Sequence, residues 1–543
     1  MKQSIFLLLL ITICTTSFGQ DGVPSNKSTV YASTITVQDL KKHLTYIASD
    51  SLEGRDTGSE GQRKAANYIA NHFAKLGLQA IAPQKDGSKG YFQYFNLYQK
   101  GWKDAYVKIG GKKKEFFKDF FPNGLTSIPD EQSTSVVFVG YGIETDDQAA
   151  FRYNDYENKN VTGKAVVFFE GEPKDKDGKN LITTNEEKSE WSERAGLQKK
   201  INIALNHGAK IFFVISDTDN RKFETLAAER KAVLGRFSSL NFSSSAATEK
   251  ATSNPTFFVS PEMAAEMLDV KIQKLEKIKN EISKNGRSNT QKIKESIVSI
   301  KAERGEVPVE TQNVMGFMEG TDKKDEVILI TAHYDHVGIQ NGQIHNGADD
   351  DGSGTCAVME IAEAFAKAKA EGNGPRRSIL FMTVTGEEKG LLGSQYYTDK
   401  DPIIPLEKTV CDLNIDMIGR IDKQHAPKEE YVYIIGADKL SSELHQINED
   451  VNKKYINFDL DYTYNDPKDP NRFYYRSDHY NFAKNKIPVI FYFTGVHEDY
   501  HRPGDDVEKI LFPKYQQITR LVFQTAWELA NRDNRIKVDS NKQ

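Results

Sequence analysis

The stretch of residues 327–354 reads VILITAHYDHVGIQNGQIHNGADDDGSG and joins an apolar run to a cluster of ionisable side chains. Residues 327–331 are almost wholly apolar, as in a strand that is buried on both faces of a parallel sheet. Residues 355–369 are rich in Ala, Met, Glu and Ile, which favours a helix. A buried strand followed by a helix predicts an α/β fold.

Between the strand and the helix lie His333, Asp335 and three adjacent aspartates, residues 349–351. Ligands of open α/β sheets bind beyond the carboxyl ends of the strands, so these side chains predict a metal site. On this stretch alone, a solvated acidic loop with an aspartate that caps the helix is an equally good interpretation. The other strand ends of the chain decide between the two.

Three further apolar runs also stop at ionisable side chains. The runs are residues 377–385, 409–417 and 487–494. The ionisable residues at their ends are Glu387, Glu388, Asp416 and His501. A charge that follows a buried strand needs a partner. Because the carboxyl ends of parallel strands share one edge of the sheet, chance explains the set poorly and a metal site is favoured.

Five of these side chains can hold two metals. If Asp350 bridges, His333 and Asp416 complete one site, and Glu388 and His501 complete the other. Each metal then has three protein ligands and an open position, as catalytic zinc requires. We therefore predict two Zn²⁺ per chain, while manganese and cobalt remain alternatives on ligand type.

The predicted charges favour hydrolysis at this site. Two divalent cations and three carboxylates leave one positive charge, which favours a hydroxide that bridges the metals. Glu387 lies beside a ligand but points elsewhere by strand alternation, so we expect it to act as general base and to return the proton to a leaving amine. Asp335 lies on the same side of the strand as His333, and we expect it to orient that imidazole.

These motifs closely resemble the M28 family of co-catalytic dizinc peptidases. The resemblance rests on residues 333–335 (HYD), 347–354 (GADDDGSG), 386–394 (GEEKGLLGS), 414–417 (NIDM) and 500–503 (YHRP). It implies an α/β domain of the zinc-peptidase/phosphorylase-hydrolase type, with a mixed, mostly parallel sheet and helices on both faces. It also implies that Asp350 bridges two zinc ions, that a cis peptide follows Asp350, and that Glu387 is the acid/base.

The resemblance also suggests residues that contact the substrate. Tyr500 occupies the position of a tyrosine that helps to stabilise the tetrahedral oxyanion. Asp478 fits a family pattern, although a packed turn near the pocket is an equally good interpretation. Tyr474, Tyr475 and Arg476 belong to an aromatic segment that we expect to wall the substrate pocket or to cover it. Three nearby histidines match no ligand position: His336, His345 and His497.

The chain divides into five predicted segments. They are a secretory signal (1–20), the start of the peptidase domain (21–132), an inserted β-rich domain (133–260), a charged helical connector (261–305) and the zinc peptidase domain (306–543). The insert resembles the protease-associated domain of many M28 members. Residues 52–59, a glycine-bounded loop between two packing helices, resemble the family's entry segment.

The leading hypothesis is an exported aminopeptidase that acts on peptides. A carboxypeptidase or dipeptidase of the same fold is the alternative, in which Arg472 or Arg476 would hold a terminal carboxylate. A glutaminyl cyclase could retain these ligands with one zinc, but the GLLGS continuation looks more like the peptidases. A binding module with a dead site predicts lost ligands, and none is lost.

Composition and charge add little to the functional prediction, whereas the N-terminal segment indicates where the protein is located. The chain has 543 residues, 38% hydrophobic residues and a net charge of -5, which is typical of an ordinary soluble protein. No basic stripe or motif indicates nucleic acid. Residues 1–20 have the charged start, apolar run and small residues of a secretory signal, and no later run is long enough to cross a membrane. We expect a periplasmic or extracellular protein, and the sequence carries no signal for its oligomeric state.

Overall fold

The computed structural model describes most of the chain. The described residues are 27–145, 151–175, 177–183, 189–192, 194–216, 222–235, 239–242, 250–290 and 293–541. The predicted secretory signal, residues 1–20, lies outside them. None of the helices in the described part of the chain has both the length and the apolar character that a membrane crossing needs. Cys356 and Cys411 are buried free thiols.

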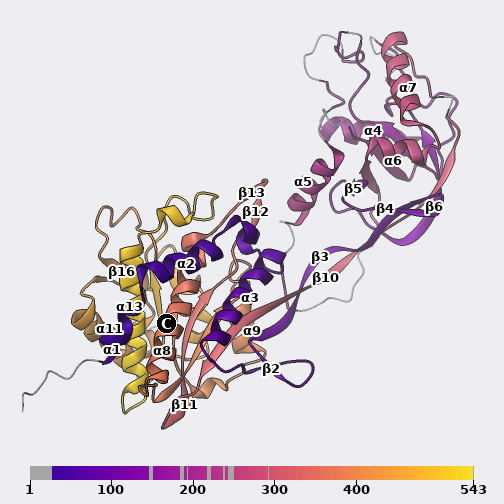
Figure 1. The fold of residues 1–543 in the computed structure, drawn as a ribbon. Coiled ribbons are helices and arrows are strands. Elements are labelled where there is room, and N and C mark those ends of the chain that lie inside the picture. The colour runs from indigo at the N-terminus through magenta and orange to yellow at the C-terminus, as the bar shows by residue number, and fades with distance from the viewer. Residues whose placement is uncertain are drawn as a thin grey trace, which may run out of the picture.

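Two bodies are joined by a two-stranded antiparallel ribbon (Figure 1). The ribbon consists of β3 (Phe92–Ile109) and β10 (Ser296–Met318), which pair along nearly their whole length with a bulge at Glu303 and Arg304. One end of each strand belongs to the sheet of the larger body and the other end to the sheet of the smaller one. Through this ribbon, the strands of both bodies form one continuous fourteen-stranded sheet.

The larger body has the mixed, mostly parallel sheet that the sequence predicts. Its strand order is β17-β16-β18-β15-β11-β14-β10, with β3 beyond β10. The four predicted strands are the parallel neighbours at its centre: β11 (Lys323–His333), β14 (Arg377–Val384), β15 (Thr409–Ile415) and β18 (Val489–Phe493). The remaining strands are β16 (Tyr431–Ile435), antiparallel to β18, and β17 (Asp459–Asp461), parallel to β16.

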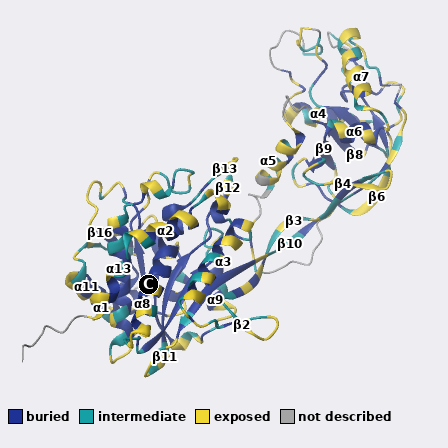
Figure 2. Ribbon diagram, viewed as in Figure 1, coloured by how far each residue is buried: buried dark blue, intermediate teal, exposed yellow. Residues whose placement is uncertain are grey.

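Helices cover both faces of this sheet, which confirms the predicted fold class. Strand alternation sends Ile328 and Ile330 of β11 into one core and Val327 and Leu329 into the other. The first face is covered by α1 (Lys27–Ala32), α2 (Val37–Ile47), α3 (Glu60–Lys75), α8 (Gly354–Ala370), α11 (Ser442–Tyr455) and α13 (Phe512–Asn531). The second face is covered by α9 (Leu392–Asp399), α12 (His479–Ala483) and the end of α10 (Ala437–Leu440). Figure 2 shows the central strands buried and the outer helix surfaces exposed.

Short elements complete the larger body. Two small antiparallel pairs are β1 (Ala82–Pro83) with β2 (Lys89–Gly90), and β12 (Ile339–Gln340) with β13 (Gln343–Ile344). The helical turns are η1 (Asp50–Arg55), η2 (Ala348–Ser353), η3 (Leu406–Lys408), η4 (Thr463–Asn465), η5 (Phe473–Tyr475) and η6 (Val507–Lys509). Of these, η1, η2 and η5 lie next to the predicted site.

The smaller body differs from the β-rich insert that the sequence predicts. Its parallel strands are β6 (Ile128–Phe138), β7 (Ala165–Phe169), β8 (Ile211–Ile215) and β9 (Thr256–Val259). Two short antiparallel strands complete it: β5 (Phe120–Pro122) pairs with β9, and β4 (Lys112–Glu115) pairs with β3. Its helices are α4 (Arg194–Asn206), α5 (Phe223–Gly235), α6 (Pro261–Met267) and α7 (Ile272–Asn285). These helices fill cores on both faces of the strands, so the body is α/β.

The predicted helical connector at residues 261–305 is also corrected. Leu275, Ile278 and Ile282 of α7 are buried in the same core as the strands of the smaller body. The charged residues that suggest an exposed connector occupy only the outer face of this amphipathic helix. The smaller body therefore extends beyond residues 133–260, from within β3 to within β10.

Candidate metal centre

The parallel strands bring the five predicted ligands to one edge of the sheet. His333 ends β11, Asp416 follows β15, Glu388 follows β14 and His501 comes after β18. Nε2 of His333 lies 3.6 Å from Oδ1 of Asp416, and Nε2 of His501 lies 3.0 Å from Oε2 of Glu388. Each of the two histidines thus forms a group with a carboxylate from another strand end.

Asp350 lies between these two groups. Its Oδ1 is 3.3 Å from Nε2 of His333, and its Oδ2 is 3.1 Å from Nε2 of His501. Gly347 shapes the approach of this loop, because a Cβ there would lie 2.2 Å from the carbonyl oxygen of Asp350 and 2.5 Å from the His336 ring. One carboxylate therefore faces both groups, with one oxygen toward each.

The other two aspartates of the triplet hold the main chain. Asp351 accepts hydrogen bonds from the backbone N–H groups of His333, Gly354 and Met417. Oδ1 of Asp349 accepts one from the N–H of Gly419 at 2.6 Å. The Asp350–Asp351 peptide is cis, as the resemblance implies. Three adjacent carboxylates therefore divide into one that faces the histidines and two that fix the loop.

His336, which matches no predicted ligand position, lies in the same cluster. Its Nδ1 is 2.9 Å from Oε1 of Glu388 and 3.7 Å from Oδ2 of Asp350, and its ring is fully buried. His336 and Glu388 therefore form a close pair inside the cluster. The sequence feature that could have placed His336 in this cluster is its position three residues after His333, directly beyond the strand end.

The donor atoms of this cluster fit divalent metal ions. Two sets each bring three ligand atoms within 4.8 Å of one another: His333, Asp351 and Asp416, and His336, Asp350 and Glu388. In the first set Asp351 stands where the sequence predicts Asp350, and in the second His336 stands where it predicts His501. Oδ2 of Asp350 and Oε1 of Glu388 are buried beside the imidazoles of His501 and His336, at 3.1 and 2.9 Å. Imidazole and carboxylate donors are those that zinc prefers. His345 and His497 do not belong to either set.

Glu387 lies beside this cluster and is held by Asp335. Its Oε2 is 3.9 Å from Nε2 of His333, and its backbone N–H donates to Oδ1 of Asp335 at 3.2 Å. Burial raises the pKa of Glu387 well above its usual range, with Glu388 and Asp416 adding to the rise and His333 opposing it. The carboxyl group can therefore hold a proton more readily than an exposed glutamate.

The structure refines the predicted role of Asp335. Nδ1 of His333 lies 3.0 Å from the backbone carbonyl oxygen of Asp335 but 3.8 Å from its carboxylate. The carboxylate instead accepts from the Thr57 hydroxyl at 2.8 Å and from the N–H of Glu387. Asp335 thus orients His333 through its main chain and Glu387 through its side chain.

The N-terminal loop of residues 52–59 supports the cluster directly, beyond joining two helices. Arg55 is fully buried and donates hydrogen bonds to the carbonyl oxygens of Tyr334 at 2.8 Å and Gly347 at 2.9 Å. Asp56 pairs with Lys389, next to Glu388, at 2.7 Å. The loop therefore ties together the segments that carry the histidine, aspartate and glutamate motifs.

A pocket opens beside the metal cluster. Its wall comprises Met417, Phe473, Arg476, Phe491, Phe493, Val496 and Tyr500, together with His333, Asp350, Glu387 and Asp416. The predicted residues Arg476 and Tyr500 are thus in the wall, and the Tyr500 hydroxyl lies 3.4 Å from Nη2 of Arg476. Phe473, the residue before Tyr474, also lines this pocket.

Three predicted pocket residues lie elsewhere. Tyr474 and Tyr475 line a different cleft with Lys439 and Arg472, because successive side chains of the turn η5 point in different directions. Asp478 is fully buried behind the pocket and accepts a hydrogen bond from Ser394 at 2.5 Å. The structure therefore supports the interpretation of Asp478 as part of a packed turn.

Comparisons with known proteins agree with this geometry. Residues 313–526 match the sequence profile of peptidase family M28. Aminopeptidase YwaD of Bacillus subtilis (strain 168) is 27% identical over 261 residues, which cover 47% of this chain and 51% of that protein. A probable zinc metalloprotease of Pyrenophora teres f. teres is 27% identical over 273 residues, which cover 44% of this chain and 55% of that protein.

The chain thus spans about half the length of these curated relatives. Among solved structures, BSAP, a zinc aminopeptidase from Bacillus subtilis, is 17% identical with a TM-score of 0.45, over 94% of this chain and 99% of that chain. The profile match covers the strands, the histidine, aspartate and glutamate motifs and the pocket wall. Residues 313–526 of this chain are therefore similar to the peptidases of family M28.

Proposed function

We propose that this chain is a zinc-dependent aminopeptidase in which His333, Asp350, Glu388, Asp416 and His501 hold two zinc ions. The observation that carries the proposal is the position of Asp350, whose two oxygens face His333 and His501 at 3.3 and 3.1 Å. One carboxylate divided between two histidine–carboxylate groups is the arrangement that a bridged metal pair requires. The similarity to an aminopeptidase of Bacillus subtilis supports action at peptide N-termini.

The residues around the metals supply proton transfer and orientation. When bound, the zinc ions would polarise the scissile carbonyl and lower the pKa of the attacking water. Glu387 accepts the proton from that water and returns it to the leaving amine. Its hydrogen bond to Asp335 fixes the backbone that carries the carboxylate, so little reorganisation is needed. The Tyr500 hydroxyl, in the pocket wall, donates to the oxygen that becomes negatively charged.

The pocket wall suggests the substrate. Phe473, Phe491, Phe493 and Val496 provide aromatic and aliphatic surface, which favours an apolar side chain at the peptide terminus. Arg476 in the same wall favours a second candidate, a carboxypeptidase or dipeptidase, because a guanidinium can bind a terminal carboxylate in a bidentate manner.

Cleavage of a panel of aminoacyl-p-nitroanilides by the purified chain tests the proposal. We expect activity that is lost on chelation, returns with zinc, and is highest for apolar residues. Glu387→Gln should lower kcat about 10²- to 10⁴-fold, because it removes the proton acceptor. Glu498→Gln, which changes an exposed glutamate near His501, is the matched control and should keep full activity.

Other classes of substrate distinguish the candidate activities. Silence on every nitroanilide, with two zinc ions bound, would exclude an aminopeptidase. Cleavage of dipeptides with a free carboxyl group, lost in Arg476→Ala, would then establish the second candidate, and cyclisation of N-terminal glutamine would indicate a glutaminyl cyclase. The proposal includes export to the periplasm or the medium, which rests on the signal-like composition of residues 1–20.

A further inference from the structure

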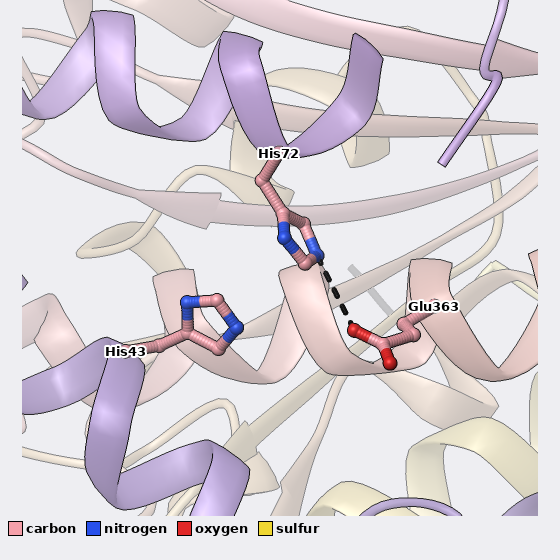
Figure 3. A group of neighbouring side chains, drawn as sticks. All are labelled: His43, His72 and Glu363. Carbon is pink, nitrogen blue, oxygen red and sulfur yellow. Dashed lines mark ion pairs between the residues drawn. The ribbon is translucent and has the colours of Figure 1, made fainter. Parts of the chain in front are cut away.

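A second cluster of possible metal ligands lies outside the proposed active site, between three helices. His43 of α2, His72 of α3 and Glu363 of α8 converge on one space (Figure 3), and their ligand atoms lie within 4.8 Å of one another. Nε2 of His72 is 3.9 Å from Oε2 of Glu363, and the two imidazole centres are 4.7 Å apart. We propose that these three side chains bind a divalent transition-metal ion that links α2 and α3 to α8.

An unpartnered buried carboxylate is independent evidence for a cation at this place. Glu360, one turn before Glu363, is only 2% exposed, and its Oε1 makes no hydrogen bond with any described residue. That oxygen lies 3.4 Å from Nε2 of His43. A buried carboxylate without a partner is unfavourable, and a divalent ion would be neutralised by Glu360 and Glu363 together.

Neighbouring groups orient the two imidazoles for this role. The Tyr68 hydroxyl lies 2.9 Å from Nδ1 of His43, which leaves Nε2 directed toward Glu360. A partner on the second ring nitrogen is the usual support of a metal-bound histidine. Nε2 of His72 has a 3.4 Å contact with the carbonyl oxygen of Met359, at the long limit of hydrogen bonding, which a bound ion would replace.

The ligand set and its exposure indicate which ions fit. Two imidazoles with carboxylate suit zinc, nickel or copper, whereas magnesium and calcium prefer oxygen alone. The Glu363 side chain is 50% exposed, so an ion can enter without unfolding the helices. Helix α8 begins directly after the Asp350 loop, and roughly 14 Å of helix separates Gly354 from Glu363. The ion would thus stabilise the scaffold and take no part in the chemistry.

Anomalous diffraction at the zinc edge, from crystals of the full chain grown with stoichiometric zinc, tests the proposal. We expect an anomalous peak enclosed by His43, His72 and Glu363, in addition to any peaks at the strand ends. Clear peaks at the strand ends with none between the three helices would overturn it. This readout does not depend on activity or on the folding of a variant.

Metal content and thermal unfolding give a second test. His72→Asn and Glu363→Gln should each bind one equivalent of zinc fewer than the unchanged chain, and extra zinc should no longer raise their Tm. Glu363 is half exposed, so Glu363→Gln should fold normally and keep its peptidase activity. His445→Asn, on α11 and outside every candidate metal group, is the matched control and should retain the full zinc content. Equal zinc content in all four proteins would contradict the proposal.

Discussion

Replacement of Arg55 by methionine tests whether the N-terminal loop holds the metal centre in place. The buried Arg55 side chain donates hydrogen bonds to the carbonyl oxygens of Tyr334 (2.8 Å), Ile47 (2.6 Å), Asn346 (2.6 Å) and Gly347 (2.9 Å). Methionine has a similar length but no donor. At about 1 kcal/mol per hydrogen bond, the four amount to about 4 kcal/mol, offset in part because a charge is no longer buried.

We therefore expect Arg55→Met to lower the free energy of unfolding by about 3–4 kcal/mol, a large share of the roughly 5–15 kcal/mol typical of a domain. Urea unfolding followed by circular dichroism measures this loss. The zinc affinity should also fall about ten- to a hundredfold, because the Gly347 carbonyl belongs to the loop that carries Asp350. Chelator competition measures the affinity.

Arg63→Met is the matched control for this prediction. Arg63 is on α3, only eight positions further along the chain, and its side chain is 49% exposed, so its replacement should change stability by no more than about 0.5 kcal/mol. Arg55→Lys should be intermediate, because an ammonium cannot reproduce the guanidinium fork. Equal unfolding free energies and equal zinc affinities for Arg55→Met and Arg63→Met would refute the role assigned to this loop.

Three further predictions concern single side chains. Thr57→Val removes the 2.8 Å hydrogen bond to Asp335 and should lower kcat about tenfold with little change in KM, whereas Thr57→Ser should retain activity; steady-state kinetics decide this. His336→Ala should weaken the binding of one of two zinc ions about ten- to a hundredfold in a chelator titration, and unchanged affinity for both would show that its nitrogen is not a ligand. Burial lowers the pKa of Lys200 from 10.5 to about 7, so its contribution to stability is present above about pH 10.5 and is lost as the pH falls toward 7. The stability difference between the unchanged chain and Lys200→Met should therefore shift by up to about 4 kcal/mol in urea unfolding between these pH values, and a constant difference would contradict it.

Local sequence patterns were sufficient for the elements that build the catalytic sheet. The apolar runs at residues 327–331, 377–385, 409–417 and 487–494 correspond to the four central parallel strands. A strand that is buried on both faces carries its signal in its own residues, and parallel strands end at a common edge whatever lies between them. The five candidate ligands could therefore be predicted to lie together before their distances were known.

The directions of individual side chains could not be predicted in this way. Asp349, Asp350 and Asp351 are chemically identical, and only their hydrogen bonds to remote backbone groups decide that Asp350 faces the histidines. His336 approaches Glu388 because the loops after β11 and β14 fold toward each other. For the same reason Phe473 lines the pocket, while Tyr474 and Tyr475 face another cleft.

The sequence by itself thus determined the four central strands, the helix that follows the aspartate cluster and the order of the ligand motifs, because hydrophobic periodicity and strand ends are local properties. Only the tertiary structure decided the roles of Arg55 and α7 and the meeting of His43, His72 and Glu363. Each of these depends on contacts between segments far apart in the chain. Such contacts follow from the packing of helices and loops against the sheet, which no local pattern encodes.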